Sequence, residues 1–196
     1  MKQYTRNILK VYSKCKHDEL QHGLTWYRDA NQWCNAVAIE HKLPLHVVVG
    51  VVAALSPTNR WSRNLIDANN LIETFINGGY VEDCKVCTYN TMRDKAWHIL
   101  QSMPHTPDDV AFILNGAKIT DFFRCIMGDD VCVIDGHAWC IANNDRRKMQ
   151  NVPNIGKKLR EQLQKSYSSA AKKHGMTAYE MQAATWVTWR RLHGLA

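Results

Sequence analysis

Apolar residues recur at three- and four-residue steps along most of the chain, which is the spacing of one face of an α-helix. Residues 3–15 and 22–41 both show this spacing, and in the second segment Tyr27, Ala30 and Cys34 fall on one face. These patterns predict two helices in the first part of the chain.

The most apolar segment is "LHVVVGVVAAL", residues 45–55. Valine-rich runs also form strands, but a long run without alternation favours a buried helix. Pro57 ends the segment, because proline disfavours helix in the residue before it. The run is too short to cross a bilayer, so we expect no membrane segment.

The rest of the chain repeats the helical spacing between turn signals. Thr106 is a candidate N-cap with Pro107 at the first helical position. Asn115-Gly116 is a two-residue break between two helices. The further expected helices span 64–76, 87–101, 107–114, 117–127, 136–143, 155–173 and 177–192. We therefore predict an all-α fold of nine or ten short helices, with no repeat and no linker.

Composition adds charge to this picture. The 196 residues carry a formal charge of +7 with a pI near 9.1, which suits a polyanionic partner, nucleic acid being the commonest. Charge alone leaves that partner open. Seven scattered cysteines without a signal peptide indicate reduced thiols, so we expect a soluble protein in a cytoplasm-like compartment.

Two residues stand out as candidates for chemistry. Lys118 opens the helix after the Asn115-Gly116 break, where a solvated lysine is the ordinary interpretation and a nucleophilic amine the alternative. Asp135 follows a short apolar run and precedes "GHAWCIAN", so it is a candidate N-cap, a role compatible with catalysis.

The segments "GAKITDFF" and "VIDGHAWCIANND" resemble the signature of the helix-hairpin-helix DNA glycosylase superfamily, the group of endonuclease III and 8-oxoguanine glycosylase. Upstream, "ALSPTNRWSRNLIDA" is similar to the family's loop that wedges into DNA. "TYNTMRDKAWHIL" is similar to the helix before the family's hairpin. The four segments occur in the family's order over roughly residues 45–145. The turn "LNGAK" is shorter than the family's hairpin, and the four-cysteine cluster of many members is absent.

The resemblance implies roles for named residues. Lys118 matches the amine that attacks the sugar in members with lyase activity, and Asp135 matches the aspartate that stabilises the developing sugar cation. Thr58 and Asn59 fall near the side chain that fills the gap left by a flipped base. The other DNA-binding residues expected from these segments are Ser56, Arg60, Trp61, Asn115, Gly116, Ala117 and His137.

Some features have simpler interpretations. His137 either lines the pocket or packs in the core, and Trp61 either packs or stacks on a base. The lone pair Cys84 and Cys87 has no second pair at metal-ligand spacing, so we expect no metal site and no cofactor. The basic run "NDRRKMQNVPNIGKKLR" is either a solvated face or a set of phosphate contacts.

The resemblance implies a two-lobed glycosylase fold with a cleft between the lobes. The expected division is 45–105 for one lobe, and 1–44 plus 106–196 for the other. The expected function is a monomeric DNA glycosylase with AP lyase activity. It would excise a damaged or modified base from double-stranded DNA during DNA repair. The expected location is the cytoplasm, in association with the nucleoid, or the host cytoplasm if the protein is viral. The alternatives are a base-hypermodification enzyme acting on modified thymine and a non-catalytic DNA-binding module.

Overall fold

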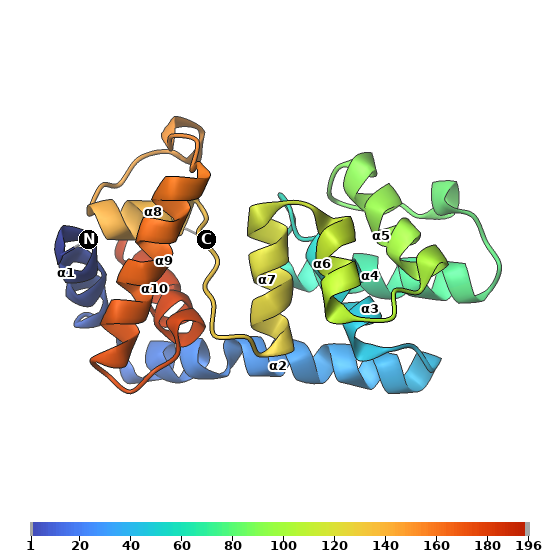
Figure 1. The fold of residues 1–196 in the computed structure, drawn as a ribbon, viewed down its shortest axis with the longest axis horizontal. Helices are drawn as coiled ribbons and strands as arrows, with labels where there is room; N and C mark the ends of the chain where they lie inside the picture. The colour runs from blue at the N-terminus through green and yellow to red at the C-terminus, as the bar shows by residue number, and fades with distance from the viewer. Residues whose placement is uncertain (1, 195–196) are drawn as a thin grey trace. The chain divides into compact units, whose positions relative to one another are not determined.

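The computed structural model describes residues 2–194, and within them the chain forms ten α-helices, two short 3-10 segments and no strand (Figure 1). The predicted all-α class is confirmed. The chain divides into two compact units: unit 1 comprises residues up to 29 and from 128 onward, and unit 2 comprises residues 30–127. No helix between residues 2 and 194 combines the length and the apolarity that crossing a bilayer requires.

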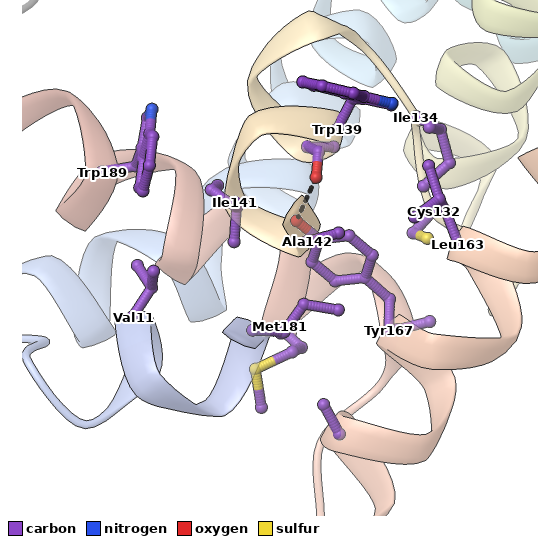
Figure 2. Packing of buried hydrophobic residues seen from close by; sticks show 14 of the residues in the cluster. Val11, Cys132, Ile134, Trp139, Ile141, Ala142, Leu163, Tyr167, Met181 and Trp189 are labelled. Atoms are coloured by element: carbon purple, nitrogen blue, oxygen red, sulfur yellow. Dashed lines mark hydrogen bonds between the residues drawn. The ribbon is translucent and has the colours of Figure 1, made fainter. Parts of the chain in front are cut away.

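Unit 1 is a helical bundle around one core. It contains α1 (Lys2–Tyr12), the first part of α2 (His17–His41), α8 (Gly136–Asn143), the 3-10 segment η2 (Met149–Asn151), α9 (Lys157–Lys172) and α10 (Ala178–Leu192). Helix α1 packs against α8, α9 and α10. Figure 2 shows this core, to which Val11 of α1, Ile141 of α8, Tyr167 of α9 and Met181 of α10 all contribute.

A close helix contact in unit 1 depends on Gly23 of α2. A Cβ atom added there would lie 2.5 Å from both the backbone N and the Cα of Ala184 in α10. Backbone atoms cannot move aside as a flexible side chain can. Glycine at position 23 therefore lets α2 and α10 approach.

Unit 2 surrounds a buried central helix. It contains the second part of α2, α3 (Leu45–Ala54), α4 (Trp61–Ile76), the 3-10 segment η1 (Val81–Asp83), α5 (Asn90–Ser102), α6 (Pro107–Leu114) and α7 (Ala117–Met127). Residues 47–54 of α3 are all buried, and α3 packs against α4, α5, α6 and α7 (Figure 1). The prediction of a buried helix for the valine-rich run is confirmed.

Local capping sets several helix ends. Thr106 caps α6: its hydroxyl accepts the Asp109 N–H at 3.2 Å, and Asp109 accepts the Thr106 N–H at 3.0 Å. Helices α6 and α8 both end at an asparagine in the left-handed conformation, Asn115 and Asn144. The predicted bounds of α6, α7 and α8 are confirmed, because these signals are local.

The grouping of helices into units differs from the expected lobes. Segments 30–44 and 106–127 belong with unit 2 rather than with the N- and C-terminal helices. Helices α6 and α7 pack on α3, and Asn31 of α2 donates to the Ile126 carbonyl of α7 at 2.9 Å. The packing thus places segments 30–44 and 106–127 in one unit with α3, and the hydrophobic pattern of the sequence does not indicate which helices pack together.

Candidate functional site

Asp135 caps the N-terminus of α8. Its Oδ1 accepts a hydrogen bond from the Ala138 N–H at 2.8 Å, and its backbone is extended at φ −103°. The side chain is half-buried. Among residues 2–194, no other group donates a hydrogen bond to this carboxylate. The predicted cap is confirmed.

Helix α9 holds the chain on both sides of Asp135. Arg160 Nη1 donates to the Ile134 carbonyl at 3.1 Å, and Gln164 Nε2 donates to the Cys132 carbonyl at 3.1 Å. Tyr167 adds a bond to the Ala138 carbonyl at 3.3 Å, drawn as a dashed line in Figure 2. Three side chains spaced along one face of α9 thus fix the backbone that carries the carboxylate.

Tyr167 donates its hydrogen bond to the Ala138 carbonyl as a neutral hydroxyl. It is fully buried, and burial raises its pKa well above the ordinary value of tyrosine. A neutral phenol keeps the proton that it donates to the Ala138 carbonyl. The hydrogen bond therefore persists across the physiological pH range.

His137 lies in the first turn of α8, two residues after Asp135. Its ring meets the Trp186 ring edge-on, with centroids 6.3 Å apart and an angle of 86°. Its Nδ1 is buried and has no hydrogen-bond partner within the described part of the chain. His137 therefore both packs against an aromatic ring and keeps one polar atom unused.

A basic loop covers the start of α8. A Cβ atom on Gly136 would lie 2.8 Å from Met149 Sδ, so the loop after α8 packs closely there. Arg147 lies over the Trp139 ring at 4.7 Å and pairs with Asp145. Within the predicted basic run, Arg147 and Arg160 thus make structural contacts, whereas Lys148, Lys157 and Lys158 are exposed.

Lys118 lies in the first turn of α7 and is exposed. Asn115, at φ 42°, turns the chain between α6 and α7, and the first intrahelical bond runs from Thr120 N–H to the Gly116 carbonyl. The N–H groups of Ala117, Lys118 and Ile119 precede that bond and have no acceptor within the helix. This turn is a helix N-terminus that can meet an anion.

Residues 55–60 form the connection between α3 and α4. Thr58 adopts φ 57°, a left-handed conformation that is unfavourable for a β-branched residue. Thr58 and Arg60 are exposed and Ser56 is half-buried, its hydroxyl donating to the Ala53 carbonyl at 2.8 Å. The strained tip of this loop is thus presented to solvent.

Asp67 of α4 anchors the same loop from inside. Its side chain is 0% exposed and accepts three hydrogen bonds, from Asn59 Nδ2 at 3.0 Å, Arg63 Nε at 2.7 Å and the Cys87 N–H at 2.8 Å. Asn59 therefore points inward, and its amide serves the loop's own structure. The bond to Cys87 also holds residues 84–88 outside a helix, so α5 begins at Asn90, later than the expected residue 87.

Trp61 connects the loop with α7. Its ring meets the Phe122 ring of α7 edge-on at 6.3 Å and 88°. Phe122 lies one helical turn after Lys118, on the same face of α7. Unit 2 therefore brings together the exposed loop residues, Trp61 and Lys118, while Asp135 and His137 belong to unit 1.

Sequence reasoning missed the residues that hold the candidates in place. Asp67, Arg160 and Gln164 were not selected, although Arg63 and Asp67 have the four-residue spacing of a helical ion pair. The bonds to Cys87, Ile134 and Cys132 join residues at least 20 positions apart, so the sequence contains no local signal for them.

The cysteines are free thiols, with Cys84 buried and Cys87 exposed. Over the described range, no group of three or more His, Cys, Asp or Glu side chains is arranged to hold a metal ion.

Comparison with known proteins identifies a family for this chain. The family model described as "Family of unknown function (DUF7178)" matches residues 1–193. No curated protein and no solved structure matches the chain. The match spans almost all of the sequence, and the chain therefore belongs to the DUF7178 family.

Proposed function

We propose that this protein is a DNA glycosylase with AP lyase activity, acting on a damaged or modified base in double-stranded DNA. The observation that carries the proposal is Asp135: a half-buried carboxylate at a helix N-terminus, with one oxygen bonded to the backbone and the surrounding chain held by α9. The order of segments that resemble the glycosylase superfamily supports the same assignment.

The chemistry explains why such a carboxylate is useful. Cleavage of an N-glycosidic bond builds positive charge on the sugar ring, and a fixed anion nearby lowers the energy of that state. The bond from the Ala138 N–H holds the Asp135 carboxylate in place at the start of α8. Rigid support by Arg160 and Gln164 reduces the reorganisation required during reaction.

Lys118 supplies the nucleophile in this proposal. Its amine attacks the sugar C1′ as the base departs with its electron pair and takes up a proton. The resulting amine adduct opens to a Schiff base, from which loss of a C2′ proton expels the 3′ phosphate. Lys118 lies in the first turn of α7 and is exposed, so its amine is accessible to a nucleotide.

The remaining residues would hold DNA. Flipping a nucleotide out of the duplex costs a few kcal/mol, which contacts elsewhere must offset. The exposed loop tip with Thr58, Arg60 and the adjoining Trp61 is suited to contact the opened duplex. Residues 107–127 are proposed to act as the helix-hairpin-helix, with the free N–H groups after Gly116 meeting a phosphate. The net charge of +7 favours association with the duplex.

Asp135→Asn tests the carboxylate directly. Asparagine is also a good N-cap, so α8 keeps its start while the negative charge is lost. We expect base release in single-turnover assays, on duplexes with oxidised, deaminated, alkylated or hypermodified bases, to fall roughly 10²–10³-fold. Asp18→Asn, which changes an exposed carboxylate of unit 1, is the matched control and leaves the rate unchanged.

Equal base release by Asp135→Asn and the wild type would overturn the glycosidic mechanism. If no panel substrate releases a base and duplex binding is intact, the result favours the non-catalytic DNA-binding module. Conversion of a hypermodified thymine without base release would favour the base-modifying enzyme.

A further inference from the structure

Unit 1 contains a second candidate site, separate from Asp135. A cavity of about 230 Å³ lies where the end of α1 meets the C-terminal ends of α8 and α10. Lys10, Lys14, Arg146 and His193 line it, and none of the described lining residues is acidic. The cavity is therefore positively charged.

Two of these cations are available to a ligand. Lys10 and Lys14 are four residues apart and exposed, and neither forms an ion pair with any residue between 2 and 194. Arg146 is held in place, because its Nη2 donates to the His193 carbonyl at 3.0 Å. That bond uses one of its five N–H donors and leaves others for an anion.

One wall of the cavity is aromatic. The His193 ring packs on the Trp189 ring with centroids 4.0 Å apart, and Trp189 is 4% exposed. The pKa of His193 is lowered, first by burial and then by the positive charges of Arg146 and Lys14. The imidazole thus senses the local excess of positive charge, which a bound anion would reduce.

We propose that this cavity binds a phosphate group. Its volume is below the roughly 300–1,000 Å³ of pockets that enclose a whole small ligand, so it holds a single group with the remainder of the molecule outside. Two ammonium groups and a guanidinium around one cavity match a tetrahedral oxyanion. The group comes either from a nucleic-acid backbone or from a free nucleotide. The inference uses neither Asp135 nor Lys118 and does not depend on the proposed glycosylase activity.

The test is an NMR titration of the His193 ring, whose signal is assigned by its loss in His193→Gln. The probes are inorganic phosphate, thymidine 5′-monophosphate, and a thymidine dinucleotide that carries only a phosphodiester. We expect saturable shifts with phosphate, weakened about tenfold or more in the double variant Lys10→Gln/Lys14→Gln. Lys173→Gln removes an exposed lysine outside the cavity and is expected to bind as the wild type does.

The two organic probes distinguish the sources. If the monophosphate binds more tightly than the dinucleotide, the site binds phosphate and its ligand is a free nucleotide. If the dinucleotide binds equally or more tightly, the site binds phosphate and its ligand is a nucleic-acid backbone. Absence of saturable shifts, or equal shifts in the double variant, overturns the proposal. If the shifts are equal in the double variant, the two lysines only stabilise the C-terminal end of a helix through their positive charge. The double variant would then lower the melting temperature without changing phosphate binding.

Discussion

Glu19 illustrates how single residues stabilise unit 1. Its side chain is 6% exposed and pairs with Arg191, and it accepts hydrogen bonds from the Lys16 N–H at 2.9 Å and Thr188 Oγ1 at 3.1 Å. The bond from Arg191 is the main cause that lowers the pKa of Glu19 to about 2, against the opposing effect of burial. This carboxylate therefore links the start of α2 to the end of α10.

The lowered pKa of Glu19 predicts an acid-sensitive stability. In the unfolded chain the carboxyl takes up its proton near its ordinary pKa of 4.5, whereas in the folded protein it does so only near 2. The stabilisation, on the order of 3 kcal/mol, is fully present above pH 5 and is lost as the pH falls from about 5 to 2. Chemical unfolding at a series of pH values measures it, and Glu19→Gln should flatten the curve in that window. An unchanged slope in Glu19→Gln would contradict this assignment.

Thr58→Gly tests the strain in the exposed loop. The left-handed conformation costs a non-glycine residue about 1–2 kcal/mol, while glycine costs about 0.5–1 kcal/mol in unfolded-state entropy. We expect the free energy of unfolding to rise by up to about 1 kcal/mol, measured by urea denaturation. Duplex binding should weaken, because the loop tip loses its side chain. A loss of stability would show that the Thr58 side chain supports the loop rather than strains it.

At the scale of elements, the ends of helices were predictable where the signal was local. Thr106, Asn115 and Asp135 each act on their own helix, and the bounds of the helices that they cap were predicted correctly. The start of α5 was placed too early, because the buried carboxylate of Asp67 holds the Cys87 N–H. The same carboxylate turns Asn59 inward, which no nearby residue indicates.

The contact between α2 and α10 yields a prediction for Gly23→Ala. The added methyl group meets backbone atoms of Ala184 at 2.5 Å, so the two helices must separate. We expect destabilisation of about 1–3 kcal/mol, measured by chemical denaturation.

Gly156→Ala is the matched control for that contact. Nothing lies within 4 Å of the added atom, and Gly156 is the N-cap of α9. The control should cost below about 1 kcal/mol. Equal effects of the two substitutions would contradict the close helix contact.

At the scale of the whole molecule, the sequence was sufficient for the fold class but not for the grouping of helices. Helical spacing is a property of each segment, whereas the packing of α6 and α7 on α3 depends on side chains far apart in the chain. In the same way, Asp135 could be identified from its cap position. The support that it receives from Arg160 and Gln164 appears only in three dimensions.

The proposed function assigns the nucleophile to Lys118 of unit 2 and the stabilisation of the sugar cation to Asp135 of unit 1. The most direct measurement is borohydride trapping on the panel of modified duplexes, followed by mass-spectrometric mapping of the adduct. We predict a covalent adduct on the peptide that contains Lys118, lost in Lys118→Ala and retained in the control Lys85→Ala, which removes an exposed lysine of the same unit. Trapping that persists in Lys118→Ala, or its absence from every duplex that binds, would contradict the assignment of Lys118 as the nucleophile.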